Sequence, residues 1–277
     1  MRKLTYTFKN DILFKMVFVK YPHLLKKLVA SILNIPSESI TAFEILNSEI
    51  TPESIKDKFC RLDINMRVNG QVVDIEMQVS NEGNYPERVM FYWAREYSSA
   101  LLVGEDYSLL PRTIVISIMD FKLFDCEEYH SFFQPLEVNR HTLLSDKMGF
   151  HFFELPKLPD LPEDVDESNA LLLWLSLFNA STEEELEKLN QTEVSVMNEA
   201  INAYYSVANS SEYREIEKLR EKAKHDEAQA LRSAEQRGVK QVALKLLKRN
   251  RPIDEIIEDT GLTYSEIEEL RAVTHLS

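Results

Sequence analysis

The feature that most constrains the fold is an Asn-Gly pair between two runs of alternating apolar and polar residues. The runs are Phe59–Val68 and Gln71–Val79, and residues 69–70 join them. A two-residue type I′ turn needs positive φ at both positions, which Asn and Gly adopt most readily. The sequence therefore predicts a β-hairpin in which Asp63 lies opposite Glu76.

The same register divides the hairpin into an apolar face and a polar face. Side chains along a strand alternate between the two faces of a sheet. The apolar set forms the predicted core face: Leu62, Ile64, Met66, Val68, Val73, Ile75, Met77 and Val79. The polar set shares the opposite face: Arg61, Asp63, Asn65, Asp74, Glu76 and Gln78.

Paired carboxylates on neighbouring strands need an explanation because they repel each other. At ~5 Å and an effective dielectric of ~20, the repulsion is roughly 3 kcal/mol. A divalent cation such as Mg²⁺ or Mn²⁺ removes this cost, because it prefers hard oxygen ligands. The alternative is a solvated face in which Arg61 and Arg67 neutralise the acids.

The remaining periodicity predicts a mixed α/β part followed by an all-helical part. Before residue 160, the first helical segment begins at Asn10 or Asp11, breaks at Pro22 and ends before Pro36. A second helix is predicted from Pro86 to about Val103. Strands are predicted at Ile40–Leu46, Thr113–Met119, His130–Val138 and Gly149–Leu155. Later helices are predicted at Ser168–Asn179, Thr182–Asn190, Thr192 to about Asn250, Ile253–Asp259 and after the capping box Thr263–Glu266.

Composition excludes several classes of protein. The two cysteines show no disulfide framework, and the six histidines show no zinc-ligand spacing. The N-terminus lacks a signal peptide's apolar core, and no apolar run is long enough to span a membrane. We therefore expect a reducing, intracellular setting in the cytoplasm, with no membrane partner.

Charge is distributed unevenly along the chain. The net charge is −14, but residues 161–210 hold ten acidic residues and one lysine, so this block carries most of the excess. The stretch 236–253 contains six basic residues and no acid, among them Lys245, Lys248 and Arg249. Such a cluster suits phosphate neutralisation, so the whole-chain charge does not exclude DNA.

These patterns divide the chain at residues 160 and 250. We expect a catalytic-type domain over 1–160, an acidic helical region with a long helix over 161–250, and a small helical tail over 251–277. The long helix has a thin apolar stripe, which is typical either of a solvated helix or of an oligomer seam. The tail is either a packing unit or a helical hairpin that reads DNA.

Several motifs together resemble a known nuclease family. They are Asn10-Asp-Ile-Leu-Phe-Lys15, Leu62-Asp-Ile64, Val73-Asp-Ile-Glu-Met-Gln78, Arg88 with Tyr92, Gly104-Glu-Asp-Tyr107, Ile114–Met119 and Ile253–Leu262. In order and content the chain is similar to the PD-(D/E)XK restriction-endonuclease-like core, and more closely to the Rpn family of recombination-promoting nucleases and transposases. The resemblance implies an α/β (α+β) core with a helical C-terminal region.

The resemblance also assigns expected roles to single residues. It implies that Asp63 and Glu76 hold Mg²⁺ or Mn²⁺, and that Gln78 replaces the usual lysine that positions the attacking water. It implies that Asp11 reaches the site from the first helix and that Lys15 touches a phosphate. For Asp11 a plain helix N-cap remains the alternative. Arg88 is expected to contact phosphate, with a surface ion pair as its alternative.

The function expected from these features is metal-dependent hydrolysis of DNA. The enzyme would be a Mg²⁺-dependent endodeoxyribonuclease linked to recombination, mobile elements or defence, assembled into a homo-oligomer through its C-terminal helices. The alternative is a non-catalytic oligomeric DNA-binding or interaction protein that retains a nuclease fold. Loss of metal binding in a Glu76 variant would favour the enzyme.

Overall fold

The centre of the fold is a mixed six-stranded sheet. A computed structural model describes residues 2–46, 64–81, 83–162, 165–192 and 194–274. The strands are β1 (Phe43–Ile45), β2 (Ile64–Val68), β3 (Gln71–Gln78), β4 (Thr113–Met119), β5 (His130–Phe133) and β6 (Met148–Glu154). Their order is β1-β2-β3-β4-β6-β5, and β3, β4 and β6 run parallel.

The predicted hairpin is confirmed in its turn and in its register. Asn69 and Gly70 have φ values of 49° and 80°, as a type I′ turn requires. Asn65 lies opposite Asp74 and Val68 lies opposite Gln71. The Asn69 side chain also binds the segment before β1, because its Oδ1 accepts the backbone N–H of Thr41 at 2.9 Å.

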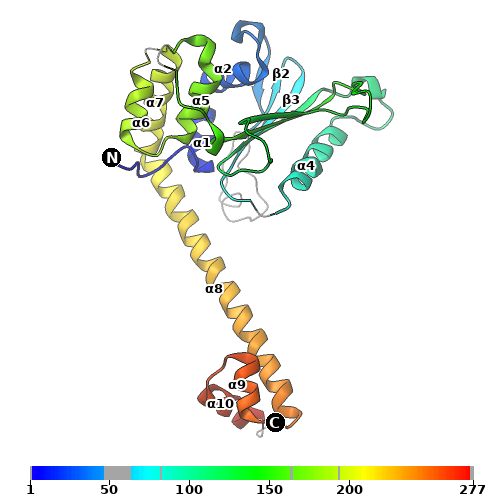
Figure 1. Cartoon of the computed structure of the whole chain (residues 1–277), viewed down its shortest axis with the longest axis vertical. Helices are drawn as coiled ribbons and strands as arrows, with labels where there is room; N and C mark the ends of the chain where they lie inside the picture. Colours follow the sequence, from blue (N-terminus) through cyan, green and yellow to red (C-terminus); the bar gives the residue numbers. More distant parts are fainter. Residues whose placement is uncertain (1, 47–63, 82, 163–164, 193, 275–277) are drawn as a thin grey trace. The chain divides into compact units, whose positions relative to one another are not determined.

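One face of the sheet is covered by helices from two stretches that lie far apart in the sequence. They are α1 (Asp11–Lys20), α2 (Pro22–Leu33), α5 (Ala170–Asn179), α6 (Glu183–Asn190) and α7 (Ser195–Ala208). Figure 1 shows this group on one side of β2 and β3. Apolar residues of these helices form one core with the odd-numbered residues of β3, such as Ile75 and Met77.

The opposite face of the sheet is covered by α4 (Tyr85–Ser99). A second core joins Tyr85 and Val89 of this helix to apolar side chains of β4 and β6: Val115, Met119, Phe150 and Phe152. Trp93 fixes the helix to β4, because its indole Nε1 donates a 3.0 Å hydrogen bond to the carbonyl of Thr113. This face carries the even-numbered residues of β3, which include the acids.

The predicted boundary at residue 160 is wrong. The chain forms one compact unit over Met1–Glu217 and a second over Lys218–Ser277. Helix α5 belongs to the first unit because its aromatic rings pack on α1: the Phe14 and Phe178 centroids are 5.4 Å apart, and those of Phe18 and Trp174 are 5.9 Å apart. The acidic block is therefore part of the first unit.

Several predicted elements are shorter than expected or divided, and three of them have a clear outcome. The long helix expected from Thr192 is two helices, α7 and α8 (Ser211–Lys248), because Ser210 Oγ accepts the N–H of Tyr213 at 3.1 Å and caps a new helix. Strand β5 ends before Pro135, which has no N–H to donate to a ladder. Helix α4 ends at Ser99 instead of Val103, four residues early.

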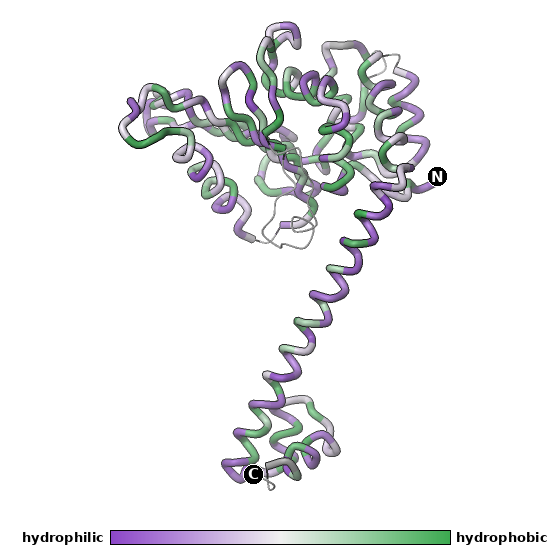
Figure 2. Tube along the Cα trace, turned by 180° about the vertical axis from the view of Figure 1, so that it is seen from behind, coloured by the Kyte–Doolittle hydropathy of each residue, from purple (hydrophilic) through white to green (hydrophobic). Residues whose placement is uncertain are grey.

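The second unit contains most of α8, then α9 (Ile253–Thr260) and α10 (Tyr264–Thr274). Its core is small and joins Ala243, Ile256 and Ile267. Gly261 ends α9 in the left-handed conformation, and Thr263 with Glu266 forms the predicted capping box of α10. Figure 2 shows that the middle of α8 is mostly hydrophilic, in agreement with its thin apolar stripe.

A histidine pair lies at the edge of the sheet. Nε2 of His130 on β5 is 3.0 Å from Nδ1 of His151 on β6, and the two rings are parallel. Burial, helped by the nearby His130 and Arg112, lowers the pKa of His151 to about 3. Burial also lowers the pKa of His130. Both rings are therefore neutral near pH 7.

Candidate functional site

The described part of the candidate site is built on β3. Asp74, Glu76 and Gln78 lie two residues apart on one face of this strand, as the alternation predicted. Asp63 and Arg61 lie outside the described residues, so the pairing of Asp63 with Glu76 stays a prediction. The observed register from Ile64 to Val68 agrees with that pairing.

The acidic face is not solvated. Asp74 is 6% exposed and Glu76 is 4% exposed, because α4 and the aromatic side chains of β6 cover this face. The alternative interpretation of a hydrophilic surface is therefore wrong for these two residues. Burying carboxylates is costly unless they are paired, hydrogen-bonded or bound to a cation, so their position is typical of a functional site.

Two hydroxyl groups donate to one oxygen of Glu76. Tyr85, at the start of α4, directs its O–H to Oε1 in a short hydrogen bond. Ser117, which lies opposite Glu76 on the parallel strand β4, donates from Oγ to the same oxygen over 3.3 Å. Neither residue is among those predicted from the sequence. The signal for Ser117 was present, since it is the only polar side chain inside the apolar run Ile114–Met119.

Gln78 ends β3 on the same side as Glu76. Its side chain is half-buried, and its amide Nε2 donates to the carbonyl of Ser80 at 2.8 Å. The neighbouring strand continues past it, because the N–H of Asp120 donates to the Gln78 carbonyl at 2.9 Å. Glu76 and Gln78 therefore share one face near the end of β3, and the catalytic role of Gln78 stays a prediction.

Helix α1 carries two of the residues predicted for the site, Asp11 and Lys15. Asn10 is the N-cap, because its Oδ1 accepts the N–H of Leu13 at 3.1 Å, while Oδ1 of Asp11 accepts the N–H of Ile12 at 3.0 Å. The helix packs against the core face, opposite to Glu76. Lys15 is 3% exposed, so it is buried instead of lying on the surface. The catalytic role of Asp11 and the phosphate contact of Lys15 stay predictions.

Arg88 is linked to the site through an aromatic ring. Its guanidinium carbon lies 5.0 Å from the ring centroid of Tyr85, one helical turn earlier on α4. Tyr92 follows four residues later on the same helix and is half-buried. The structure therefore places a cation next to the residue that contacts Glu76. Its contact with a phosphate stays a prediction.

The expected DNA-binding residues near the C-terminus belong to the second unit. Lys245, Lys248 and Arg249 are exposed at the end of α8 and just after it. Arg251, from the same basic stretch, forms an ion pair of 2.8 Å with Glu255 on α9. The basic cluster is therefore partly neutralised at one end, while all six of its cations lie on the surface.

The donor set around Glu76 suits a hard divalent cation. Its members are carboxylate and amide oxygens, the ligand type that Mg²⁺ and Mn²⁺ prefer. Within the described residues, the side chains alone make no cluster of three or more His, Cys, Asp or Glu that could hold a metal ion. A cation here would therefore need ligands beyond these residues, and Asp63, water and a substrate phosphate are the ones we expect.

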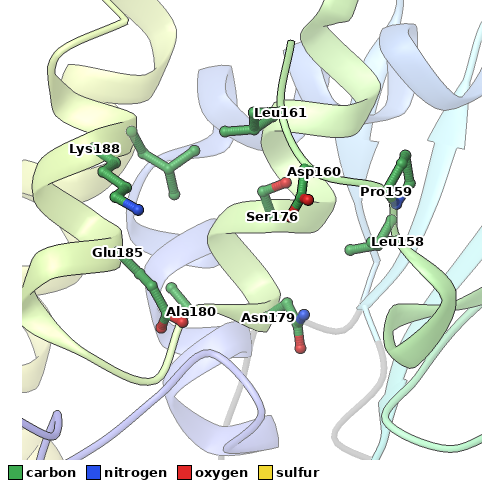
Figure 3. Close-up of a pocket in the computed structure, with 10 residues that line it drawn as sticks. Leu158, Pro159, Asp160, Leu161, Ser176, Asn179, Ala180, Glu185 and Lys188 are labelled. Carbon is green, nitrogen blue, oxygen red and sulfur yellow. The ribbon is translucent and has the colours of Figure 1, made fainter. Parts of the chain in front are cut away.

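A separate pocket lies between α5, α6 and the preceding segment (Figure 3). It has a volume of about 440 Å³, and its lining mixes Lys188 with the carboxylates of Asp160 and Glu185. None of its lining residues is a predicted site residue. The pocket therefore does not extend the candidate site on β3.

Comparisons with known proteins place the chain in one family. The described residues include no helix long and apolar enough to cross a membrane. No curated protein and no solved structure shows a significant match to the chain. A family model described as PD-(D/E)XK nuclease family transposase matches residues 8–234, which include the whole sheet, α4 and most of α8. The chain therefore belongs to the PD-(D/E)XK nuclease family transposases.

Proposed function

We propose that the chain is a divalent-metal-dependent endonuclease that hydrolyses phosphodiester bonds in DNA. The observation that carries this proposal is the burial of Glu76 under α4, two residues before Gln78 on the same strand face. Membership of a nuclease family supports a nuclease-type or transposase-related activity, and DNA is the substrate this family implies. Recombination, mobile-element transfer or defence is the setting that we propose for it.

Each residue of the proposed site would have a separate role. Asp63 and Glu76 would hold Mg²⁺ or Mn²⁺, which supplies an activated water and stabilises charge on the phosphate. Gln78 would orient that water through its amide, which carries no charge. Arg88, next to Tyr85, would hold a substrate phosphate close to the carboxylate face. Because a neutral amide stabilises negative charge less than an ammonium does, we expect slow turnover.

The test is cleavage of a supercoiled plasmid in Mg²⁺, Mn²⁺, Ca²⁺ or chelator. Glu76→Gln is the sharpest variant, because it removes the charge but keeps an oxygen that accepts the hydroxyls of Tyr85 and Ser117. It should abolish cleavage while the protein without metal keeps its melting temperature. Glu87→Gln, on the exposed side of α4, is the matched control and should cleave normally. Cleavage by Glu76→Gln at the wild-type rate would contradict the site.

A second candidate function is a non-catalytic, oligomeric DNA-binding protein. It is favoured by the separate C-terminal unit, where the exposed cations Lys245, Lys248 and Arg249 follow a long hydrophilic helix. This candidate predicts DNA binding that does not change in chelator and no cleavage in any metal. Assembly through the C-terminal helices is compatible with both functions.

A further inference from the structure

The hydroxyl group of Tyr85 contacts the carboxylate that we propose as a metal ligand. Tyr85 is 1% exposed, and its O–H donates to Oε1 of Glu76. A hydrogen bond from a phenol to a carboxylate is charge-assisted, and charge-assisted bonds are about twice as strong as neutral ones. The bond therefore fixes one oxygen of the Glu76 carboxylate.

Ser117 reinforces the same oxygen from the neighbouring strand. Its side chain is fully buried, and Oγ lies 3.3 Å from Oε1 of Glu76. The two donors come from different elements, α4 and β4, so they approach the carboxylate from different directions. A carboxylate with one oxygen held by two hydroxyls has little freedom to rotate.

The Tyr85 ring is itself held in place. Its edge-to-face neighbours are Phe121, at a centroid distance of 5.8 Å, and Phe152, at 6.3 Å. The Arg88 guanidinium lies over the ring at 5.0 Å. A hydroxyl on a packed ring is pre-organised, so the bond to Glu76 costs little further side-chain entropy.

We propose that Tyr85 is a positioning residue that, together with Ser117, orients Glu76 for the divalent cation. Groups that orient a metal ligand typically change metal affinity or activity by 10–100-fold when they are removed. This inference rests on the proposed function, since it concerns the same metal site.

The test measures Mn²⁺ binding to the full-length protein by titration calorimetry, beside the kinetics of DNA cleavage. Tyr85→Phe keeps the packed ring and removes only the hydroxyl, so it should weaken Mn²⁺ binding by about 10-fold or more. It should lower kcat and leave KM for DNA unchanged, because the hydroxyl contacts Glu76 and not the substrate. Ser117→Ala should act in the same direction with a smaller effect, because its hydrogen bond is longer.

Tyr97→Phe is the matched control. It removes a phenol from the same helix, where the ring stacks on Trp93 at 4.8 Å, and it should bind Mn²⁺ like the wild type. If Tyr85→Phe and Ser117→Ala both bind Mn²⁺ with wild-type affinity, the positioning role is overturned while the proposed function stands. If the wild type binds no Mn²⁺, the proposed function fails, and the positioning role fails with it.

Discussion

The amide nitrogen of Gln78 donates a 2.8 Å hydrogen bond to the carbonyl oxygen of Ser80, just after β3 ends. This bond ties the side chain to its own backbone and fixes which way the amide faces. With Nε2 used in this way, Oε1 is the amide atom that we expect to accept a hydrogen bond from a water molecule. Gln78 is therefore an oriented polar group beside Glu76, and its identity should affect turnover.

The first prediction concerns the side chain at position 78. Gln78→Ala should lower the cleavage rate at least ~10-fold, because oriented polar groups at a reacting centre contribute on that order or more. Gln78→Lys should keep or raise the rate, because an ammonium stabilises developing negative charge better than an amide. Gln71→Ala, at the other end of β3, is the control. An alanine variant at position 78 with an unchanged rate would leave Gln78 without a catalytic role.

The second prediction concerns Arg88 and DNA. Arg88→Gln should weaken DNA binding uniformly across sequences and lower the slope of log affinity against log salt by about 1, as expected for one phosphate contact. Mn²⁺ affinity should stay at the wild-type level. Arg95→Gln, on the exposed part of α4, is the matched control. If the two variants bind DNA equally well, Arg88 serves only to pack on Tyr85.

Local chemistry explains why part of the site could be predicted from the sequence. The turn at Asn69 and Gly70 sets the strand register by itself, and the register places Asp74, Glu76 and Gln78 on one face. No contact far along the chain is needed for this step. The prediction of hairpin, register and shared face was therefore confirmed for the described residues.

Burial of that face could not be predicted, because it depends on α4 crossing back over the sheet. Tyr85 contacts Glu76 because α4 is held on the sheet, where Trp93 donates a hydrogen bond to the carbonyl of Thr113. The interpretation of the acids as solvated failed for this reason. Glu76→Ala should therefore lower stability in the absence of metal, because alanine would leave the buried Tyr85 hydroxyl without this acceptor, at a typical cost of about 1–3 kcal/mol.

The predicted division at residue 160 failed for a similar reason. The change to an acidic, all-helical stretch favoured a boundary, but the core contacts of Trp174 and Phe178 with α1 join residues from opposite ends of the unit. Capping gave a second error, because Ser210 sets the start of α8 through a single side-chain hydrogen bond. Such bonds decide boundaries that periodicity leaves open.

The third prediction concerns acid stability and His151. The folded-state pKa of about 3 lies below the ordinary value of 6.5, so between these values the unfolded chain binds a proton that the folded chain does not. Stability therefore falls as pH falls from about 6.5 to about 3, by at most about 1.4 kcal/mol per pH unit from this residue. Urea unfolding at pH 7, 6 and 5 should show a flatter dependence for His151→Phe. An equal pH dependence of the unfolding free energy in the wild type and in His151→Phe would show that His151 does not cause this loss of stability.

The fourth prediction concerns truncation. A chain of residues 1–217 should fold, because it keeps α5 to α7 and the buried ring of Tyr213. A chain of residues 1–160 should not, because Phe14 and Phe18 lose the aromatic partners on α5. Circular dichroism melting checks folding, and light scattering checks assembly. If the C-terminal helices carry the assembly, the 1–217 protein should be a smaller species than the full chain. An unchanged number of subunits would contradict this role.

The fifth prediction separates the cations of the C-terminal unit by their partners. Lys245, Lys248, Arg249 and Arg251 are all exposed, and Arg251 is also held by Glu255 at 2.8 Å. Because each phosphate contact adds about 0.9 to the salt slope of DNA binding, replacing Lys245, Lys248 and Arg249 by Gln should lower that slope by about 2 to 3. Arg251→Gln should lower it less than Lys248→Gln, because the ion pair already offsets its charge. Fluorescence anisotropy at several salt concentrations measures both slopes. An unchanged slope in the triple variant would mean that this cluster does not contact DNA and that the end of α8 is a solvated helix.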